Sequence, residues 1–289
     1  MILVNEQKVG LSRFPNGETL IDTTFLNELK YSREKCRINF KWCCNGDILI
    51  LAFILKHLKE LGIRKDLVIQ YMPYSRMDRY ENGNCFTLKH TVEIIKESLI
   101  AGDSVFILEP HSDVTLNLFF PYGYRVNIIT PLMQKICREN KVDMICYPDA
   151  GAKARFQDDK VNLPVVFFNK IRDFDTGKIT SLELEGESHH IAKKNVLILD
   201  DLCSRGGTFL HTANKLKEYG ARDILLGVCH METTIANGVL LEETSPINHI
   251  YCFDTLFSSY DAERFSETTE KLTIYDTNHF LLEGEIKNV

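Results

Sequence analysis

Short apolar runs alternate along the chain with segments whose apolar residues recur every three or four positions. The clearest case spans residues 195–220. Val196–Leu199 is a continuous apolar run, as expected for a parallel strand buried on both faces. Between Leu210 and Tyr219 the apolar residues share one face of a helix, and Gly220 follows in the position of a C-terminal cap. The pattern predicts a strand that ends at Leu199, a turn, and then a helix.

The same alternation runs through both halves of the chain. Strands are predicted at residues 37–42, 67–72, 104–108, 143–147, 165–168, 196–199, 224–229 and 249–253. Helices are predicted after Asp47, Thr87 and Thr130. This order favours an α/β fold of two tandem domains, each a mostly parallel sheet flanked by helices. The domains are expected at residues 1–129 and 130–275, and the tail 276–289 could pack back on the first domain.

Two carboxylates and a glycine-rich turn follow the strand predicted at 196–199. In the turn Ser204–Thr208, Gly206 and Gly207 allow the backbone to approach a ligand and to adopt positive φ at little cost. The amides of the turn and of the helix N-terminus suit a phosphate group. Asp200 and Asp201 suit sugar hydroxyls or a metal ion instead. A phosphate beside a sugar indicates a ribose phosphate; the alternative is a common glycine turn whose acids only cap a helix.

Charged residues also follow other predicted strands. Arg76 and Asp78 follow residues 67–72, and a guanidinium group matches the oxygens of a nucleotide polyphosphate. His111 has an acid two residues to either side, which suits a divalent metal or a phosphate. Lys170 and Arg172 alternate, so an extended loop directs both side chains to one side. The alternative at each place is an exposed charged loop or a structural histidine.

Composition narrows the class of protein. The 289 residues are 44% hydrophobic and 26% charged, with a formal net charge of -6 and no basic block, which argues against nucleic-acid binding. The 9 cysteines form no Cys-x-x-Cys pair, a pattern typical of reduced thiols in a cytosol. There is no apolar run of membrane-spanning length and no visible signal sequence. We expect a cytoplasmic protein with no membrane partner.

The segment Leu197–Thr208, Leu-Ile-Leu-Asp-Asp-Leu-Cys-Ser-Arg-Gly-Gly-Thr, resembles the ribose-phosphate loop of two families. These are the type I phosphoribosyltransferases and the ribose-phosphate diphosphokinases, or phosphoribosyl pyrophosphate synthetases. Further motifs resemble only the diphosphokinases, at Arg13–Thr19, Tyr71–Arg79, Glu109–Thr115 and Pro148–Gly151. The resemblance implies two tandem phosphoribosyltransferase-like domains and an ATP-dependent enzyme.

The resemblance also implies roles for individual residues. The expected ATP-binding residues are Phe14, Asn16, Glu18, Arg76, Asp78 and His111, of which the first three reach the adenine bound to a neighbouring subunit. His111 and Asp149 are the expected Mg²⁺ contacts, and Lys170 and Arg172 the catalytic pair on a mobile loop. The expected ribose-phosphate-binding residues are Asp200, Asp201, Ser204, Arg205, Gly206, Gly207 and Thr208. The implied partners are ATP, a ribose phosphate and further copies of the chain, as a dimer or hexamer.

The implied reaction transfers the β,γ-diphosphate of ATP to the C1 hydroxyl of a ribose phosphate and releases AMP. Ribose 5-phosphate is the default acceptor. However, Ser204 and Arg205 replace the usual Asp-Thr of the family loop, which removes a negative charge and adds a positive one. ADP-ribose, with two linked phosphates, is therefore a close second acceptor and connects the chain to NAD synthesis. A type I phosphoribosyltransferase and a non-catalytic regulatory homologue stay open as alternatives.

Two motifs depart from the family pattern without a clear consequence for the reaction. Met77 replaces the glutamine usual in the ATP motif, which removes one polar contact. His230–Thr234 stands where the family has a Thr-His-Gly stretch, and its role is open.

Overall fold

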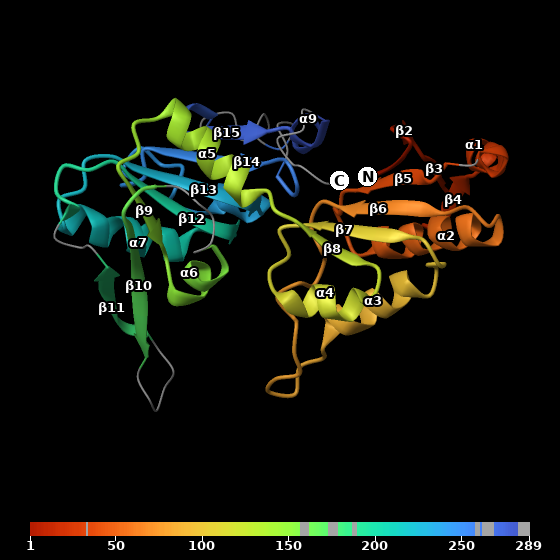
Figure 1. Ribbon diagram of the computed structural model, residues 1–289, viewed down its shortest axis with the longest axis horizontal. Helices are drawn as coiled ribbons and strands as arrows, with labels where there is room; N and C mark the ends of the chain where they lie inside the picture. The colour runs from red at the N-terminus through yellow and green to blue at the C-terminus, as the bar shows by residue number, and fades with distance from the viewer. Residues whose placement is uncertain are drawn as a thin grey trace. The chain divides into compact units, whose positions relative to one another are not determined.

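The computed structural model describes residues 1–32, 34–156, 162–172, 179–186, 190–257, 261 and 269–282. The chain divides into two compact units (Figure 1): unit 1, Met1–Val126, and unit 2, which begins at Asn127. The division falls close to the predicted domain boundary between residues 129 and 130. That the tail from residue 276 packs on the first domain stays a prediction. Among its described residues, Thr277 donates hydrogen bonds to the Asp254 carboxylate of unit 2.

Unit 1 is built on a six-stranded sheet. Its elements are β1 (Ile2–Val4), β2 (Gln7–Lys8), β3 (Gly10–Arg13), β4 (Thr19–Asp22), α1 (Thr24–Glu28), β5 (Cys36–Phe40), α2 (Gly46–Glu60), β6 (Lys65–Ile69), α3 (Thr87–Lys96), β7 (Ser104–Leu108), α4 (Asp113–Phe119) and β8 (Gly123–Val126). The strand order is β2-β1-β5-β6-β7-β8, and β3 and β4 form a separate two-stranded hairpin. β5 to β8 are parallel, and β1 is antiparallel to its neighbours.

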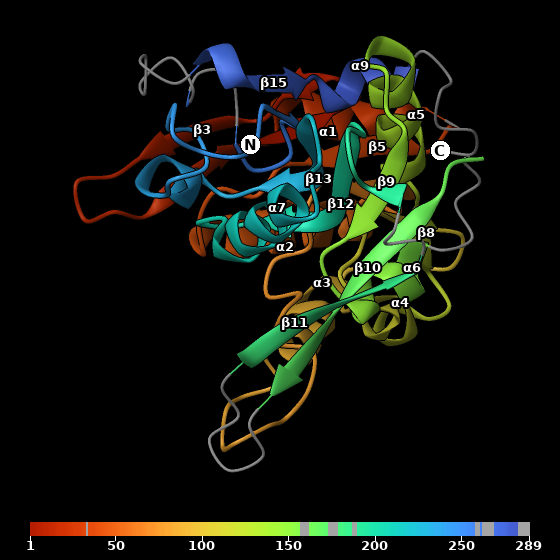
Figure 2. The ribbon, with the colours of Figure 1, turned by 90° about the vertical axis from the view of Figure 1, so that its left-hand side faces the viewer.

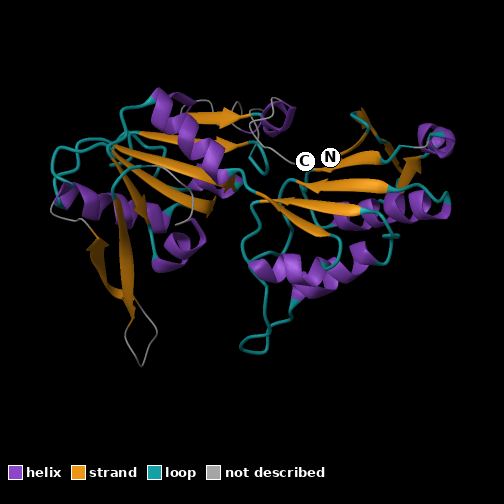
Figure 3. Cartoon of the chain, viewed as in Figure 1, coloured by secondary structure: helices purple, strands orange, loops and turns teal. Residues whose placement is uncertain are grey.

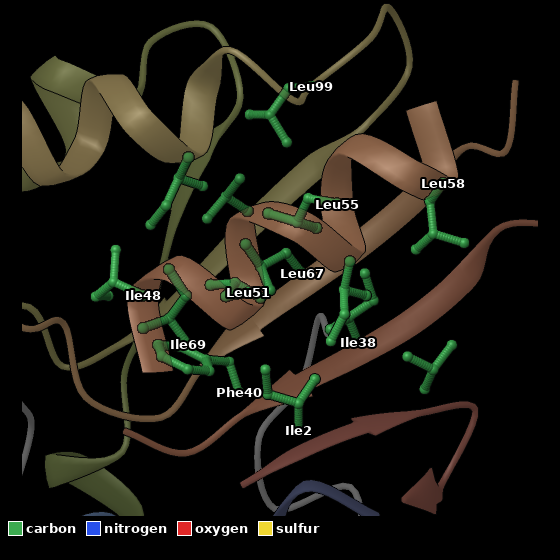
Figure 4. Packing of buried hydrophobic residues seen from close by; sticks show 14 of the residues in the cluster. Ile2, Ile38, Phe40, Ile48, Leu51, Leu55, Leu58, Leu67, Ile69 and Leu99 are labelled. Atoms are coloured by element: carbon green, nitrogen blue, oxygen red, sulfur yellow. The ribbon is translucent and has the colours of Figure 1, made fainter. Parts of the chain in front are cut away.

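The core of unit 1 lies between this sheet and its helices (Figure 4). Leu51, Leu55 and Leu58 recur at helical spacing along α2 and are fully buried. They pack against alternate residues of the strands, such as Ile38 and Leu67. α2, α3 and α4 all lie on one face of the sheet (Figures 1 and 3). This follows from the topology, because right-handed crossovers that always step in the same direction place their helices on the same face.

Unit 2 is built on a seven-stranded sheet. Its elements are α5 (Ile129–Glu139), β9 (Met144–Tyr147), α6 (Ala150–Phe156), β10 (Val165–Arg172), β11 (Ile179–Gly186), β12 (Val196–Cys203), α7 (Gly207–Glu218), β13 (Ile224–Met231), β14 (His249–Phe253), β15 (Leu272–Tyr275) and α9 (Thr277–Leu282). The strand order is β11-β10-β9-β12-β13-β14-β15. β11 is antiparallel to β10, and the other pairs are parallel.

The order of strands reverses within unit 2. From β9 the chain steps to β10 and β11 on one side, and it then returns to β12 on the other side of β9 and continues outward. Helices cover both faces of this sheet. A Cβ atom at Gly227 of β13 would lie 2.9 Å from Ile136 of α5, whereas Leu226 on the opposite face packs in a cluster with Leu216 of α7. The reversal between β9 and β12 is the point where open α/β sheets bind ligands.

Several predicted strands differ from the structure at their ends, and two of these differences concern predicted site residues. β12 does not end at Leu199 but continues through Cys203, because its pairing with β13 extends to Met231. Asp200 and Asp201 therefore belong to the strand. β10 likewise continues past Phe168 to Arg172, since β11 pairs with it as a hairpin (Figure 2), so Lys170 and Arg172 have strand rather than loop backbone. In the part of the chain that the structure describes, no helix is both long and apolar enough to cross a membrane.

Candidate functional site

The two acids predicted to bind a ribose lie at the strand reversal of unit 2. β12 pairs with β9 only as far as Ile198, so its last residues extend beyond that neighbour. There Asp200 and Asp201 meet Arg155 of α6. The Arg155 guanidinium nitrogens lie 3.1 Å from Asp200 Oδ1 and 2.9 Å from Asp201 Oδ2. Sequence reasoning missed Arg155, which stands four residues after the Pro148–Gly151 motif.

The electrostatics of this cluster are those of a partly buried ion triad. Burial raises the pKa of Asp200 well above the usual carboxyl range, the Asp201 charge raises it further, and the Arg155 charge opposes both. Burial lowers the pKa of Arg155, but the charges of Asp201 and Asp200 outweigh it and raise that pKa. The guanidinium thus favours the charged carboxylates, but for Asp200 burial and the charge of Asp201 outweigh it.

The glycine turn lies directly after β12. Gly206 has φ 83 and precedes α7, and a Cβ atom there would lie 2.2 Å from Leu240 Cδ1, so the position requires glycine. Gly207 does not share this conformation, because it is the first residue of α7, where the space around it is open. Gly207 and Thr208 are exposed at the N-terminus of this 12-residue helix, an arrangement suited to an anion. The exposed Arg205 adds a cation to the same turn.

A second segment approaches the turn from β13. Ser204 Oγ lies 3.0 Å from Thr234 Oγ1, and Thr234 Oγ1 donates to Glu232 Oε2 at 3.2 Å. The structure thus brings Glu232 and Thr234, from the His230–Thr234 stretch whose role was open, to the predicted phosphate turn. His230 is only 2% exposed, and its Nδ1 lies 2.8 Å from Thr255 Oγ1, so it belongs to the core. Nothing in the sequence of this stretch distinguished the core residue His230 from Glu232 and Thr234, which lie at the turn.

Asp149, the predicted Mg²⁺ ligand, follows β9 at the strand reversal. One of its oxygens, Oδ1, accepts the Ala152 N–H at 2.9 Å, so Asp149 caps α6. A capping carboxylate keeps further acceptor capacity on its two oxygens, so the contact with Ala152 is compatible with a metal ligand. The backbone of Lys170 and Arg172 lies in β10, and the side chains of these two predicted catalytic residues lie outside the described ones.

In unit 1, two of the predicted ATP-binding loops are joined by one hydrogen bond. Ser112 Oγ donates to Asp78 Oδ2 at 2.7 Å, and Arg79 Nε contacts Asp78 Oδ1 at 3.1 Å. Burial raises the pKa of Asp78, but the hydrogen bonds from Ser112 and Arg79 and the charges of Arg79 and His111 outweigh it, so the pKa is lowered. Arg76 is exposed and His111 half-buried in the same loops. The structure therefore brings the loops after β6 and β7 together.

The backbone of these loops is unusual. Tyr74, after β6, has φ 62, and Glu109, after β7, has φ 37, conformations that residues other than glycine rarely adopt. Such residues gather at functional sites when the surrounding structure holds them in place. For Tyr74, a hydrogen bond of 2.9 Å from its hydroxyl to Asn45 Oδ1 contributes to this.

The remaining predicted ATP-binding residues lie at the tip of the β3–β4 hairpin. Asn16 Nδ2 donates to Glu18 Oε2 at 2.7 Å, and the Glu18 N–H donates to Asn16 Oδ1 at 3.1 Å. Phe14 is 52% exposed. Asn16 and Glu18 thus order the turn, and Phe14 offers an exposed aromatic ring.

No protein-family model matches the chain, but several curated ribose-phosphate pyrophosphokinases are similar to it in sequence. It is 28% identical to a ribose-phosphate pyrophosphokinase of Sulfurisphaera tokodaii over 62% of either chain. It is 27% identical to that of Saccharolobus solfataricus, over 78% of this chain and 76% of the relative. It is 26% identical to that of Pyrococcus abyssi, over 86% of this chain and 84% of the relative.

A solved structure agrees with these relatives on the fold. The phosphoribosylpyrophosphate synthetase from Mycobacterium smegmatis matches 96% of this chain and 88% of its own, with a TM-score of 0.71 and 18% identity. The fold defines the class of protein as one built from two tandem phosphoribosyltransferase-like domains. In sequence, the chain is similar to ribose-phosphate pyrophosphokinases over most of its length.

Proposed function

We propose that the chain is an ATP-dependent diphosphokinase that transfers the β,γ-diphosphate of ATP to the C1 hydroxyl of a ribose phosphate, with ribose 5-phosphate as the default acceptor. One observation carries the proposal. An acid pair and a phosphate-binding turn meet at the strand reversal of unit 2, in a chain whose relatives are named ribose-phosphate pyrophosphokinase. Carboxylates beside a helix N-terminus match the hydroxyls and the phosphate of one ribose phosphate.

In the proposed mechanism, the turn Ser204–Thr208 holds the 5′-phosphate while Asp200 and Asp201 hold the ribose hydroxyls. The C1 oxygen attacks the β-phosphorus of ATP, the bond from that phosphorus to the α–β bridging oxygen breaks, and AMP leaves. The proton of the hydroxyl is released to solvent. Such a transfer depends mainly on positioning and on the neutralisation of phosphate charge. Lys170 and Arg172 are proposed to stabilise the charge on the moving diphosphate.

On the ATP side, Arg76 and His111 are proposed to bind the phosphates. The hydrogen bond between Ser112 and Asp78 joins the two loops that carry them and is proposed to position Arg76 and His111. Phe14, with Asn16 and Glu18, is proposed to contact the adenine of a neighbouring copy in a homo-oligomer. The exposure of Phe14 supports this role, since an exposed ring can stack on a base.

Magnesium is part of the proposal, with Asp149 and His111 as its protein contacts. Mg²⁺ prefers oxygen ligands and commonly keeps several waters beside one or two carboxylates and substrate phosphates. Among the described residues, no group of three or more His, Cys, Asp or Glu could hold a metal by itself. The donor set therefore fits an ion that arrives with the phosphates of ATP, whose charge it would offset.

The test is AMP formation from ATP and Mg²⁺, with ribose 5-phosphate and ADP-ribose supplied separately. We expect rapid AMP release that requires an acceptor. Product formation from a nucleobase without ATP would instead favour a phosphoribosyltransferase. Binding of both substrates without any turnover would favour a regulatory homologue.

The acceptor ADP-ribose is a second candidate because of Arg205. This cation is exposed in the phosphate turn, where it adds positive charge suited to a substrate with two linked phosphates. Arg205→Ala should then reduce kcat/KM for ADP-ribose more than for ribose 5-phosphate. Lys215→Ala, which removes a cation from the body of α7, is the matched control. Equal losses for both acceptors in the Arg205 variant would exclude this role.

A further inference from the structure

Arg155 touches both carboxylates of the proposed ribose site, and no role has been assigned to it. It lies on α6, a helix of 7 residues that starts directly after β9. Ala152 and Phe156 of this helix are buried, with 0% and 2% exposure, and Asp149 caps it. The helix is therefore anchored at its start and at both buried positions, and this anchoring fixes the backbone position of Arg155.

Arg155 contacts each of the two acids through a different terminal nitrogen. Nη2 contacts Asp200 Oδ1 and Nη1 contacts Asp201 Oδ2, at 3.1 and 2.9 Å. Because the guanidinium is a rigid planar fork, its two terminal nitrogens set the separation of the two oxygens that they bind. An ammonium group, as a single point charge, cannot set this separation.

The backbone alone would not place these two carboxylates together. Asp200 and Asp201 are consecutive in β12, and consecutive side chains of a strand point to opposite faces. Here both reach the same guanidinium, and the Asp201 N–H also donates to Asp200 Oδ1 at 2.9 Å. Arg155 is thus the group that gathers two divergent side chains at one place.

The cluster is largely shielded from water. The side chains of Arg155, Asp200 and Asp201 are 22%, 13% and 5% exposed. Two like charges so close together repel each other, and a cation in contact with both offsets part of this repulsion. Each carboxylate has about four lone-pair sites, so a single contact to Arg155 leaves capacity to accept a hydroxyl.

We propose that Arg155 is a positioning residue for the acceptor ribose: it holds Asp200 and Asp201 side by side so that each can accept a ribose hydroxyl. The inference rests on the proposed ribose site and names the residue that assembles it. Arg155 acts through the two acids and makes no contact with the reacting atoms. Its loss should therefore weaken acceptor binding and leave ATP binding unchanged.

The experiment compares Arg155→Ala and Arg155→Lys with the wild type in steady-state kinetics, using the acceptor that the wild type turns over. We expect the alanine variant to raise the KM for that acceptor by roughly 10–100-fold, as for other residues that orient ligand-binding carboxylates. The KM for ATP should stay within about twofold. The lysine variant keeps the charge but not the planar fork, so its KM for the acceptor should lie between those of the wild type and the alanine variant.

Lys153→Ala is the matched control, because it removes a cation from the same helix. The Lys153 ammonium lies 3.9 Å from the centre of the Phe167 ring. It should leave the acceptor KM unchanged. Calorimetric titration of each variant with the acceptor alone measures binding without turnover.

Several outcomes would decide the matter. An acceptor KM for Arg155→Ala equal to that of the wild type would overturn the inference while leaving the proposed function intact. So would equal increases in both KM values, which would indicate a merely structural role. If the alanine variant does not fold, Arg155→Lys decides, since a wild-type acceptor KM in that variant contradicts the need for a fork. If the wild type releases no AMP, the proposed function itself fails, and calorimetry still tests whether Arg155 supports ribose phosphate binding.

Discussion

The two units place their functional residues in different ways. In unit 1, the parallel strands β5 to β8 follow one another in chain order, and the connecting helices α2, α3 and α4 lie on one face of the sheet. The predicted ATP loops there follow neighbouring strands. In unit 2, the strand order reverses between β9 and β12, and helices cover both faces. Because the chain leaves β9 and β12 in opposite directions, the connections that follow these two strands diverge. Side chains can meet between them at the carboxyl ends of the strands.

This difference in topology shows in the contacts. In unit 1, a hydrogen bond from Ser112 to Asp78 joins two loops. Unit 2 joins a helix and a strand through an ion triad, and it adds a second segment at Glu232 and Thr234. In the proposed function, unit 2 binds the ribose phosphate at these contacts and unit 1 binds ATP at its joined loops. Kinetic constants for the two substrates should therefore respond separately to changes in the two units.

The largest effect is expected at Lys170. Lys170→Ala should lower kcat by about 100-fold or more, because charge stabilisation of a transition state commonly contributes this much. Both KM values and the thermal midpoint should change little. Steady-state AMP release and thermal unfolding measure these quantities. Lys194→Ala, which removes an exposed lysine of the same unit, is the control. Near-wild-type turnover of the Lys170 variant would remove it from the catalytic role.

A smaller effect is expected from the hydrogen bond that joins the loops of unit 1. Ser112→Ala should raise the KM for ATP by about tenfold and leave the acceptor KM unchanged, since hydrogen bonds to charged groups are worth about 1.5–3 kcal/mol. Thr24→Ala, which removes a hydroxyl contact to Asp22 elsewhere in unit 1, is the control. A change confined to the acceptor KM would contradict the assignment of ATP to unit 1.

The same variant has a pH signature. The pKa of Asp78 in the folded protein is lowered below its ordinary value. Ionised Asp78 therefore stabilises the fold above the pKa of the unfolded chain, and this contribution is lost as pH falls through the folded pKa. Removal of the Ser112 hydroxyl should raise the pKa of Asp78, so that the stabilisation by ionised Asp78 is lost at a higher pH. A carboxyl-carbon NMR titration measures this directly. An unchanged titration would show that the hydrogen bond does not hold the charge.

The smallest effect is expected at Glu232. Glu232→Gln keeps an oxygen that can accept the hydrogen bond from Thr234, but it removes a negative charge beside the phosphate turn. The KM for the ribose phosphate substrate should fall by roughly two- to fivefold, as for a partly exposed charge interaction. The KM for ATP should not change. Glu242→Gln is a close control, because Glu242 accepts a hydrogen bond from Thr244 at the same spacing and the same 3.2 Å. A higher KM for the ribose phosphate substrate in the Glu232→Gln variant would mean that the Glu232 carboxylate of the wild type binds substrate.

The alternation of apolar runs and helical faces predicted much of the fold correctly. The apolar residues Leu51, Leu55 and Leu58 form the buried face of α2, as their spacing indicated. Gly220 has φ 84 at the end of α7, as expected for a helix cap. Errors arose at strand ends. Hydrophobicity stops at Leu199, but backbone pairing with β13 continues through polar residues to Cys203, and pairing leaves no mark in the apolar pattern.

The sequence alone determined the chemical groups: two adjacent acids, a glycine turn before a helix, and basic residues after strands. These follow from local rules, because backbone freedom, capping and side-chain chemistry act over a few residues. Only the tertiary structure decided which distant groups meet these residues. Arg155 reaches Asp200 and Asp201, and Thr234 reaches Ser204, because β9, β12 and β13 lie side by side in the sheet. Strand order depends on long-range pairing and packing, which no short stretch of sequence records.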